Sequence, residues 1–239
     1  MTFGAFITGI FFIIIQLFAN RFIPSSRIQR SRWLSFSGGI AVSYVFVYVL
    51  PALHEQQAAY GQEVEQLTME SELYFVGLIG VLVLFGIKKL ADNQEEQEKK
   101  SKKQFWVELS FFSLYNMLIS YVVITSQVAG WQAVFYSTAV GTHFLAVAYD
   151  LWSEDKHSYE RIGRYILALA ILIGWTLATW ITLTPLLVAI IFAFISGAMI
   201  LNVLKEELPT KRQAHFPSFV IGSVSYTFIV IALKYFFEW

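Results

Sequence analysis

Apolar runs long enough to cross a lipid bilayer recur along the whole chain, and they constrain its fold more than any other feature. A transmembrane helix needs about 20 apolar residues, because each residue advances the helix by about 1.5 Å. Charged residues gather between the runs, whose approximate limits are 3–20, 33–53, 73–90, 105–126, 131–152, 162–181, 185–204 and 216–236. The sequence therefore predicts an all-α, polytopic membrane protein with eight transmembrane helices in a single domain over 1–239.

Composition supports a membrane class and excludes several others. Hydrophobic residues make up 56% of the chain and charged residues 14%, whereas a soluble domain carries about 25% charged residues. Cysteine is absent, which excludes disulfides and thiolate metal sites. The formal net charge is zero, and we expect no nucleic-acid partner. We expect the lipid bilayer to be the main partner.

The distribution of Lys and Arg predicts the orientation. With eight spans, all 17 basic residues except Lys234 fall in the connections that follow the first, third, fifth and seventh runs. Short loops rich in Lys and Arg stay in the cytoplasm. We therefore expect both termini outside, a cytoplasmic loop at about 88–104, and a location in the plasma (inner) membrane. The mixed charges of that loop favour a solvated, partly helical linker.

Small residues indicate where helices approach closely. In lipid, packing of small side chains replaces the hydrophobic drive that brings helices together in water. We expect close contacts at Gly38, Gly39, Gly77, Gly80, Ala193 and Gly197.

Two polar residues lie near the centres of adjacent runs. Asn116 is central in the fourth run, and His143 is central in the fifth. Few residues join these runs, so we expect an antiparallel hairpin in which the two side chains face each other, buried from lipid. Such residues are candidate functional groups. The alternative is a purely structural hydrogen bond between them, worth about 1 kcal/mol.

Neighbours at helical spacing extend both polar positions into stripes. Ser113 and Ser120 share the face of Asn116, while Tyr136 and Asp150 lie seven residues to either side of His143. Asp150 and Glu108 lie near the ends of their runs, so the alternative for these two is a solvated end charge.

Two further segments carry a family resemblance. "SGGIAVSYVFVYVLPAL" (37–53) is similar to a Gly-rich helix that ends in Leu-His-Leu-Leu-Pro, with Tyr48 in place of the His. "ISGAMILNVLKEELP" (195–209) is similar to a helix ending in Glu-x-x-Pro, with Glu206 on the Glu. Both helices are typical of the ZIP (Zrt/Irt-like) family of divalent metal transporters, which the chain resembles over its whole length as a divergent member. The resemblance implies a ZIP-like bundle.

The metal motifs of that family are mostly absent. Its fourth span carries His-Asn-x-x-Asp-Gly, where this chain has Tyr115, Asn116, Ile119 and Ser120 at the fixed positions. Its fifth span carries His-Glu-x-Pro-His-Glu, where the matching segment is "HFLAVA" (143–148). The resemblance thus implies that Asn116 and His143 are the remnant of a metal site. Two neutral ligands do not compensate a buried dication, so we expect at most weak divalent metal binding and no certain cofactor.

These observations favour a ZIP-like membrane transporter, with divalent metal ions among its candidate substrates. The candidate path residues are Asn116, His143, Tyr115, Tyr48, Asp150 and Glu206. The alternative is a non-transporting pseudo-transporter that acts as a membrane scaffold or partner subunit, and a homodimer is compatible with either role. We expect no enzyme, because no carboxylate pair, Ser–His–Asp set or His-rich cluster lies at depth. His143 is the only mid-depth His, which disfavours bis-histidine haem.

Overall fold

The computed structural model describes residues 3–22, 24, 26–63, 71–92, 97–126, 130–208 and 215–237, and this part of the chain is helical with no strand. Its elements are α1 (Phe3–Phe22), α2 (Arg27–Tyr44), η1 (Val45–Val49), α3 (Leu50–Glu63), α4 (Glu72–Asp92), α5 (Gln97–Thr125), α6 (Gly130–Glu154), α7 (Lys156–Ser158), η2 (Tyr159–Gly163), α8 (Arg164–Trp180), α9 (Pro185–Asn202), η3 (Val203–Glu207) and α10 (Phe216–Phe237).

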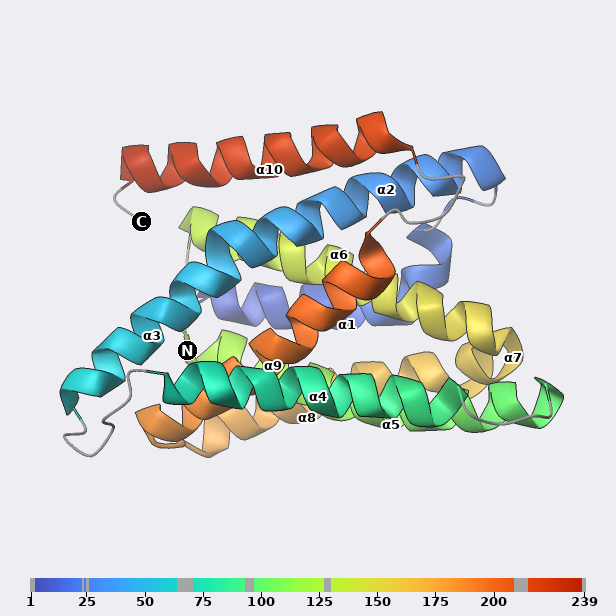
Figure 1. The fold of residues 1–239 in the computed structure, drawn as a ribbon, viewed down its shortest axis with the longest axis horizontal. Helices are drawn as coiled ribbons and strands as arrows, with labels where there is room; N and C mark the ends of the chain where they lie inside the picture. Colours follow the sequence, from blue (N-terminus) through green and yellow to red (C-terminus); the bar gives the residue numbers. More distant parts are fainter. Residues whose placement is uncertain are drawn as a thin grey trace.

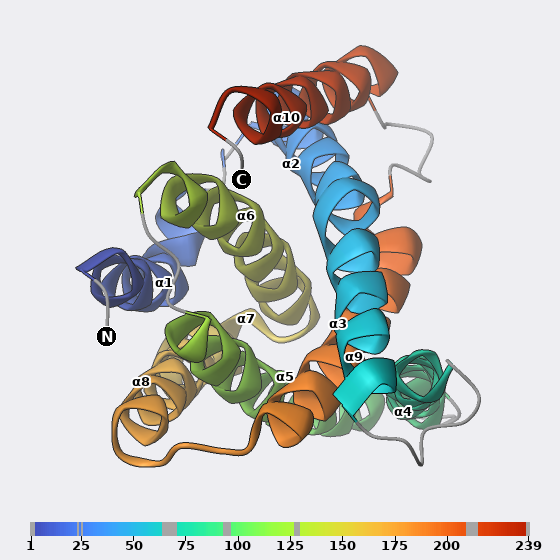
Figure 2. The same cartoon turned by 90° about the vertical axis from the view of Figure 1, so that its left-hand side faces the viewer.

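Within the described ranges these elements form eight helical passes, as the apolar runs predicted. α2, η1 and α3 are one continuous pass, as are α7, η2 and α8, and also α9 and η3. Successive passes run in alternating directions along the long axis, and both ends of the described chain lie at the same end of the bundle (Figures 1 and 2). We call the opposite end, where α4 and α6 finish and α5 begins, the basic end.

The outer surface of the bundle is apolar. Large hydrophobic side chains are exposed along α1, α4, α8 and α10, which is the reverse of a water-soluble protein. Five helical stretches of the described chain are long and apolar enough to cross a membrane: Phe3–Phe22, Ile28–Ala59, Lys102–Thr125, Lys156–Trp180 and Pro185–Glu207. α6 carries more polar residues and is largely buried inside the bundle, so its weaker apolar character fits a central helix.

Glycines set the close helix contacts, as predicted. A Cβ at Gly197 of α9 would collide with the carbonyl oxygen of Gly77 in α4, and one at Gly80 with that of Phe194. A Cβ at Gly39 would likewise collide with the carbonyl of Phe219 in α10. Without side chains at these points, the α4–α9 and α2–α10 backbones approach directly, and these are among the most extensive helix contacts.

Three π-helical turns, η1, η2 and η3, interrupt the passes. In η1 the Leu50 N–H bonds to the Val45 carbonyl, five residues back. Pro51 follows directly, and in a regular α-helix its ring would clash with the carbonyl four residues earlier. The wider turn relieves that clash. Each π turn adds one residue relative to an α-helix and therefore shifts which side chains face the interior afterwards.

Two sequence-based expectations need correction. The 88–104 segment is not simply a solvated linker: α4 runs to Asp92, α5 begins at Gln97, and Lys88 is buried, although 93–96 lie outside the described residues. The predicted α5–α6 hairpin is also not the main packing unit. α5 packs most extensively against α8, and α6 against α1.

Candidate functional site

α6 carries the polar face predicted from the seven-residue spacing of Tyr136, His143 and Asp150. Tyr136 meets the rings of Tyr44 and Tyr48 from the second pass. His143 makes hydrogen bonds in the middle of the bundle, and Asp150 lines a cavity at the basic end. One face of this central helix therefore presents polar groups at three depths.

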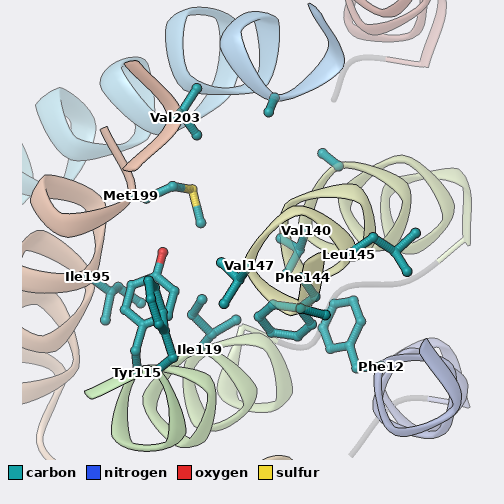
Figure 3. Packing of buried hydrophobic residues seen from close by; sticks show 14 of the residues in the cluster. Phe12, Tyr115, Ile119, Val140, Phe144, Leu145, Val147, Ile195, Met199 and Val203 are labelled. Atoms are coloured by element: carbon teal, nitrogen blue, oxygen red, sulfur yellow. The ribbon is translucent and has the colours of Figure 1, made fainter. Parts of the chain in front are cut away.

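His143 lies at the centre of a buried hydrogen-bond network. Its Nδ1 lies 2.6 Å from Oε1 of Glu207, and the two side chains are 1% and 2% exposed. An ionised carboxylate only accepts, so with Glu207 ionised Nδ1 carries the proton and donates it. The Tyr115 hydroxyl lies 3.2 Å from Nε2, and the Asn202 amide donates to Glu207 Oε1 at 3.2 Å. Tyr115 points from α5 toward the space between α6 and α9 (Figure 3).

Two oxygen atoms of this network have no hydrogen-bond partner among the described residues. They are Oε2 of Glu207 and Oδ1 of Asn202, and both are buried. A buried carboxylate or amide oxygen without a partner is costly, and native structures normally satisfy such groups. Both oxygens belong to residues that bond each other, so the network presents two acceptors suited to a cation or a proton donor.

The sequence analysis selected Glu206 where the structure uses Glu207. In an α-helix, Asn202 and Glu206 would share a face, since residues four apart are neighbours. In η3 the Leu208 N–H bonds to the Val203 carbonyl five residues back, so residue 207 takes the inward position. Glu206 instead points to the basic end, where its Oε1 lies 3.0 Å from Lys88 Nζ. The adjacent Glu–Glu pair was the available signal, but sequence gave no sign of the π turn.

Asn116 and His143 are both buried, but they do not bond each other, so the alternative of a structural hydrogen bond between them is wrong. Neither atom of its amide has a partner among the described residues. Ser120, four residues later on the same stripe, donates to the Ile171 carbonyl of α8. The stripe thus follows the α5–α8 contact, and Tyr115, one residue before Asn116, reaches His143 instead.

Tyr48 belongs to a cluster of tyrosine rings on the side of His143 away from the basic end. Its ring stacks on Tyr44 with centroids 5.2 Å apart and meets Tyr136 edge-on at 5.5 Å. Tyr226 of α10 interacts electrostatically with Tyr136 and Tyr48. The cluster carries four hydroxyls and no charge, and Tyr136 interacts with Tyr115 across the gap to the network.

A polar cavity of about 460 Å³ opens at the basic end between α4, α5, α6 and η3. Asp150 and Glu206, two of the predicted path residues, line it together with Lys88, Glu108 and Glu154. Glu108 is buried, so the alternative of a solvated end charge is wrong for it, whereas Asp150 is half-buried at the cavity. The Lys88 side chain is only 8% exposed. Gln104 links two carboxylates by donating to Glu108 at 3.0 Å and to Glu154 at 3.1 Å.

The positions that the ZIP resemblance would assign to metal ligands are packed with apolar side chains. Ile119, Phe144, Val147 and Ala148 are all buried in the main core cluster, several of them visible in Figure 3. Among the described residues, no three or more His, Cys, Asp or Glu side chains are grouped so that they could hold a metal ion.

Comparison with known proteins identifies one family match. Residues 57–152, less than half of the chain, match the family described as "Protein of unknown function (DUF3270)". No curated protein and no solved structure matches. The matched segment includes α4, α5 and most of α6, and so contains Tyr115, His143 and Asp150, but not Glu207.

Proposed function

We propose that this chain is an integral membrane transporter of ZIP-like design that moves small cations, with divalent metal ions as the first candidates. The observation that carries the proposal is the buried His143–Glu207 pair, whose network holds two oxygens without a partner among the described residues. Ionisable groups are costly inside a membrane protein and occur mainly on substrate and ion pathways. A protein that only fills the bilayer has no need of them.

The outer surface supports insertion of all eight passes into a bilayer. Exposed Phe, Leu, Ile and Val side chains cover the helices at the periphery, where lipid tails would meet them. The excess of Lys and Arg at the basic end supports an orientation with this end in the cytoplasm, and the proposed location is the plasma membrane. The cavity would then open to the cytoplasm, and the tyrosine cluster would lie toward the outside.

The geometry favours weak, transient cation binding. Glu207 and Asn202 offer oxygens, and His143 offers an imidazole only if it gives up one of its two hydrogen bonds. A transported ion must be released as well as bound, so low affinity is compatible with transport. One carboxylate leaves much of a dication's charge uncompensated at this depth, which limits the time the ion spends there.

Uptake into liposomes tests the proposal. Purified protein is reconstituted with a metal-sensitive dye inside, and Zn²⁺, Mn²⁺ or Fe²⁺ is added outside. We expect uptake of at least one ion above empty liposomes, and its loss in Glu207→Gln. Glu160→Gln is the matched control, because Glu160 pairs with the Trp152 indole away from the network. Absence of uptake for all three ions, with folded protein in the bilayer, would contradict the proposal.

The second candidate is a non-transporting membrane scaffold or partner subunit. The apolar packing at Ile119, Phe144, Val147 and Ala148 favours it, because these side chains fill the region where the ZIP resemblance places a metal path. In that role Glu207→Gln would change the stability of the protein without any transport phenotype, and a homodimer detected by mass measurement in detergent would fit it.

A further inference from the structure

A series of titratable side chains runs through the bundle, hydrogen-bonded at its centre, and we propose that it is a path for protons. We call it the polar file and define it by Tyr48, Tyr136, Tyr115, His143, Glu207 and Asp150. The inference rests on the proposed transport function in one respect: protons would move together with, or in exchange for, the transported metal cation. The path itself is argued from contacts within the described part of the chain.

The middle of the polar file is directly hydrogen-bonded. Tyr115, His143 and Glu207 are linked by contacts of 3.2 Å and 2.6 Å through the two different nitrogens of one imidazole. Such an imidazole accepts a proton on one nitrogen and releases a proton from the other, which makes it a relay group. His143 thus joins a carboxylate on its basic side to a hydroxyl on the other.

Toward the basic end, the polar file continues into the cavity. Asp150 lines the cavity and interacts electrostatically with Glu207, Glu206, Glu108 and Lys88. These are the charged groups that face the lower part of the file, from α4, α5 and η3. The cavity gives Asp150 access to water at the basic end, whereas Glu207 lies behind it and is buried.

Toward the opposite end, hydroxyl groups carry the file onward. Tyr115 interacts with Tyr136, and the hydroxyls of Tyr136 and Tyr44 are hydrogen-bonded. Tyr136 and Tyr48 lie in ring contact, and Tyr48 interacts with Glu55, an exposed residue of α3. Tyr226 of α10 completes the set of titratable groups around this part. The file therefore reaches an exposed carboxylate beyond the tyrosine cluster.

Each transfer in the file conserves protons and needs no redox partner. With Glu207 ionised and the proton on Nδ1, His143 passes that proton to the Glu207 carboxylate while its Nε2 takes the hydroxyl proton of Tyr115. In the same event Tyr136 passes its hydroxyl proton to the Tyr115 oxygen and is itself reprotonated from the side of Glu55, so no tyrosinate forms, and Glu207 then releases its proton toward Asp150. Rotation of the hydroxyls and the reverse tautomer of His143 restore the starting state. Protons fit this file better than metal ions, because among the described residues no three His, Cys, Asp or Glu side chains are grouped so that they could hold a metal.

Proton flux into liposomes tests the inference without any metal. Purified full-length protein is reconstituted with a pH dye inside, and a potassium gradient with valinomycin supplies the driving potential. We expect acidification at least several-fold faster than in empty liposomes, and loss of that excess in Glu207→Gln and His143→Gln. Glu160→Gln and His157→Gln are matched controls with the same chemical changes outside the file, and both should conduct like wild type.

Tyr115→Phe is a second variant, chosen because it should fold even if Glu207→Gln or His143→Gln does not. It removes only the hydroxyl and keeps the ring that packs on Phe111 and Phe112, so a folded variant with strongly reduced flux is the expected result. Wild-type flux equal to that of empty liposomes, or full flux in Glu207→Gln or Tyr115→Phe, would overturn the path. Metal uptake without proton flux would overturn the proton path and support the proposed metal transport. Proton flux without metal uptake would support the proton path and overturn the proposed metal transport.

Discussion

At the residue scale, His143 and Glu207 form a short hydrogen bond between two buried side chains. Removing one partner of a buried hydrogen bond leaves the other group unsatisfied and costs about 1–3 kcal/mol, more where that group is charged. We expect His143→Ala and Glu207→Ala each to lower the melting temperature in detergent. The decrease in the double variant should be clearly smaller than the sum of the two single decreases. Coupling of this kind is the signature of a direct contact. Additive losses would contradict the 2.6 Å contact.

Asp155 gives a pH-dependent prediction outside the spans. It is the N-cap of α7, and hydrogen bonds from the Ser158 backbone N–H and hydroxyl hold the pKa of its carboxyl below the ordinary value. A lowered pKa adds stability above the unfolded-state pKa of about 3.9, and this is lost as pH falls through the folded-state value. Asp155 is mostly solvated, so screening makes the effect small.

We therefore expect Asp155→Ala to cost about 1 kcal/mol at pH 7, a typical value for a lost N-cap. The difference from wild type should shrink as the pH is lowered below about 4, because the protonated carboxyl caps less well. Melting temperatures of both proteins at a series of pH values measure it. A difference that grows with acidification would show that the sign is wrong.

At the element scale, glycine contacts hold the helix pairs together. Gly197→Ala would force a methyl group into the Gly77 carbonyl, and overpacking of this kind typically costs about 1–3 kcal/mol. Gly86→Ala in α4 is the matched control, because nothing lies within 4 Å of its Cβ position. At that position the better helix propensity of Ala should raise the free energy of unfolding by about 0.5–1 kcal/mol. Equal effects of the two changes on the melting temperature would contradict the α4–α9 packing.

The same scale explains what sequence could and could not predict. Apolar run length predicted the eight passes, and seven-residue spacing predicted the polar face at Tyr136, His143 and Asp150. Glu207 was missed because a π turn inserts one residue, and local propensity does not reveal it. The pairing of Asn116 was wrong because chain adjacency suggested an α5–α6 hairpin. Tertiary packing instead turns that face of α5 toward α8, as the Ser120–Ile171 contact shows.

At the scale of the whole molecule, the proposed topology has a direct test. The natural chain has no cysteine, so a single introduced cysteine reports one position without background. Lys102→Cys lies in α5 near the basic end, and Thr182→Cys lies between α8 and α9 at the opposite end; both native side chains are exposed. In intact cells, a membrane-impermeant thiol reagent should label Thr182→Cys and leave Lys102→Cys unlabelled until the membrane is opened. The reverse pattern would invert the orientation.

The side chains at the centre of the bundle limit how tightly it can bind a metal ion. A tight Zn²⁺ site needs about four good ligands with compensating charge. The centre of this bundle offers one carboxylate and one imidazole that already bond each other, while the positions implied by the ZIP resemblance hold Ile119, Phe144, Val147 and Ala148. Each missing ligand or orienting partner typically costs tenfold or more in affinity. We therefore expect no Zn²⁺ binding at this depth tighter than about micromolar.

His143→Ala should accordingly lower the melting temperature and leave the weak Zn²⁺ affinity of the solubilised protein almost unchanged. Calorimetric titration of the solubilised protein with Zn²⁺ decides the matter when wild type, His143→Ala and the surface control His157→Ala are compared. Submicromolar binding that disappears only in His143→Ala would contradict the prediction. It would mean that Glu207 Oε2 and Asn202 Oδ1, which have no partner among the described residues, join the imidazole around the ion once the His143–Glu207 bond opens.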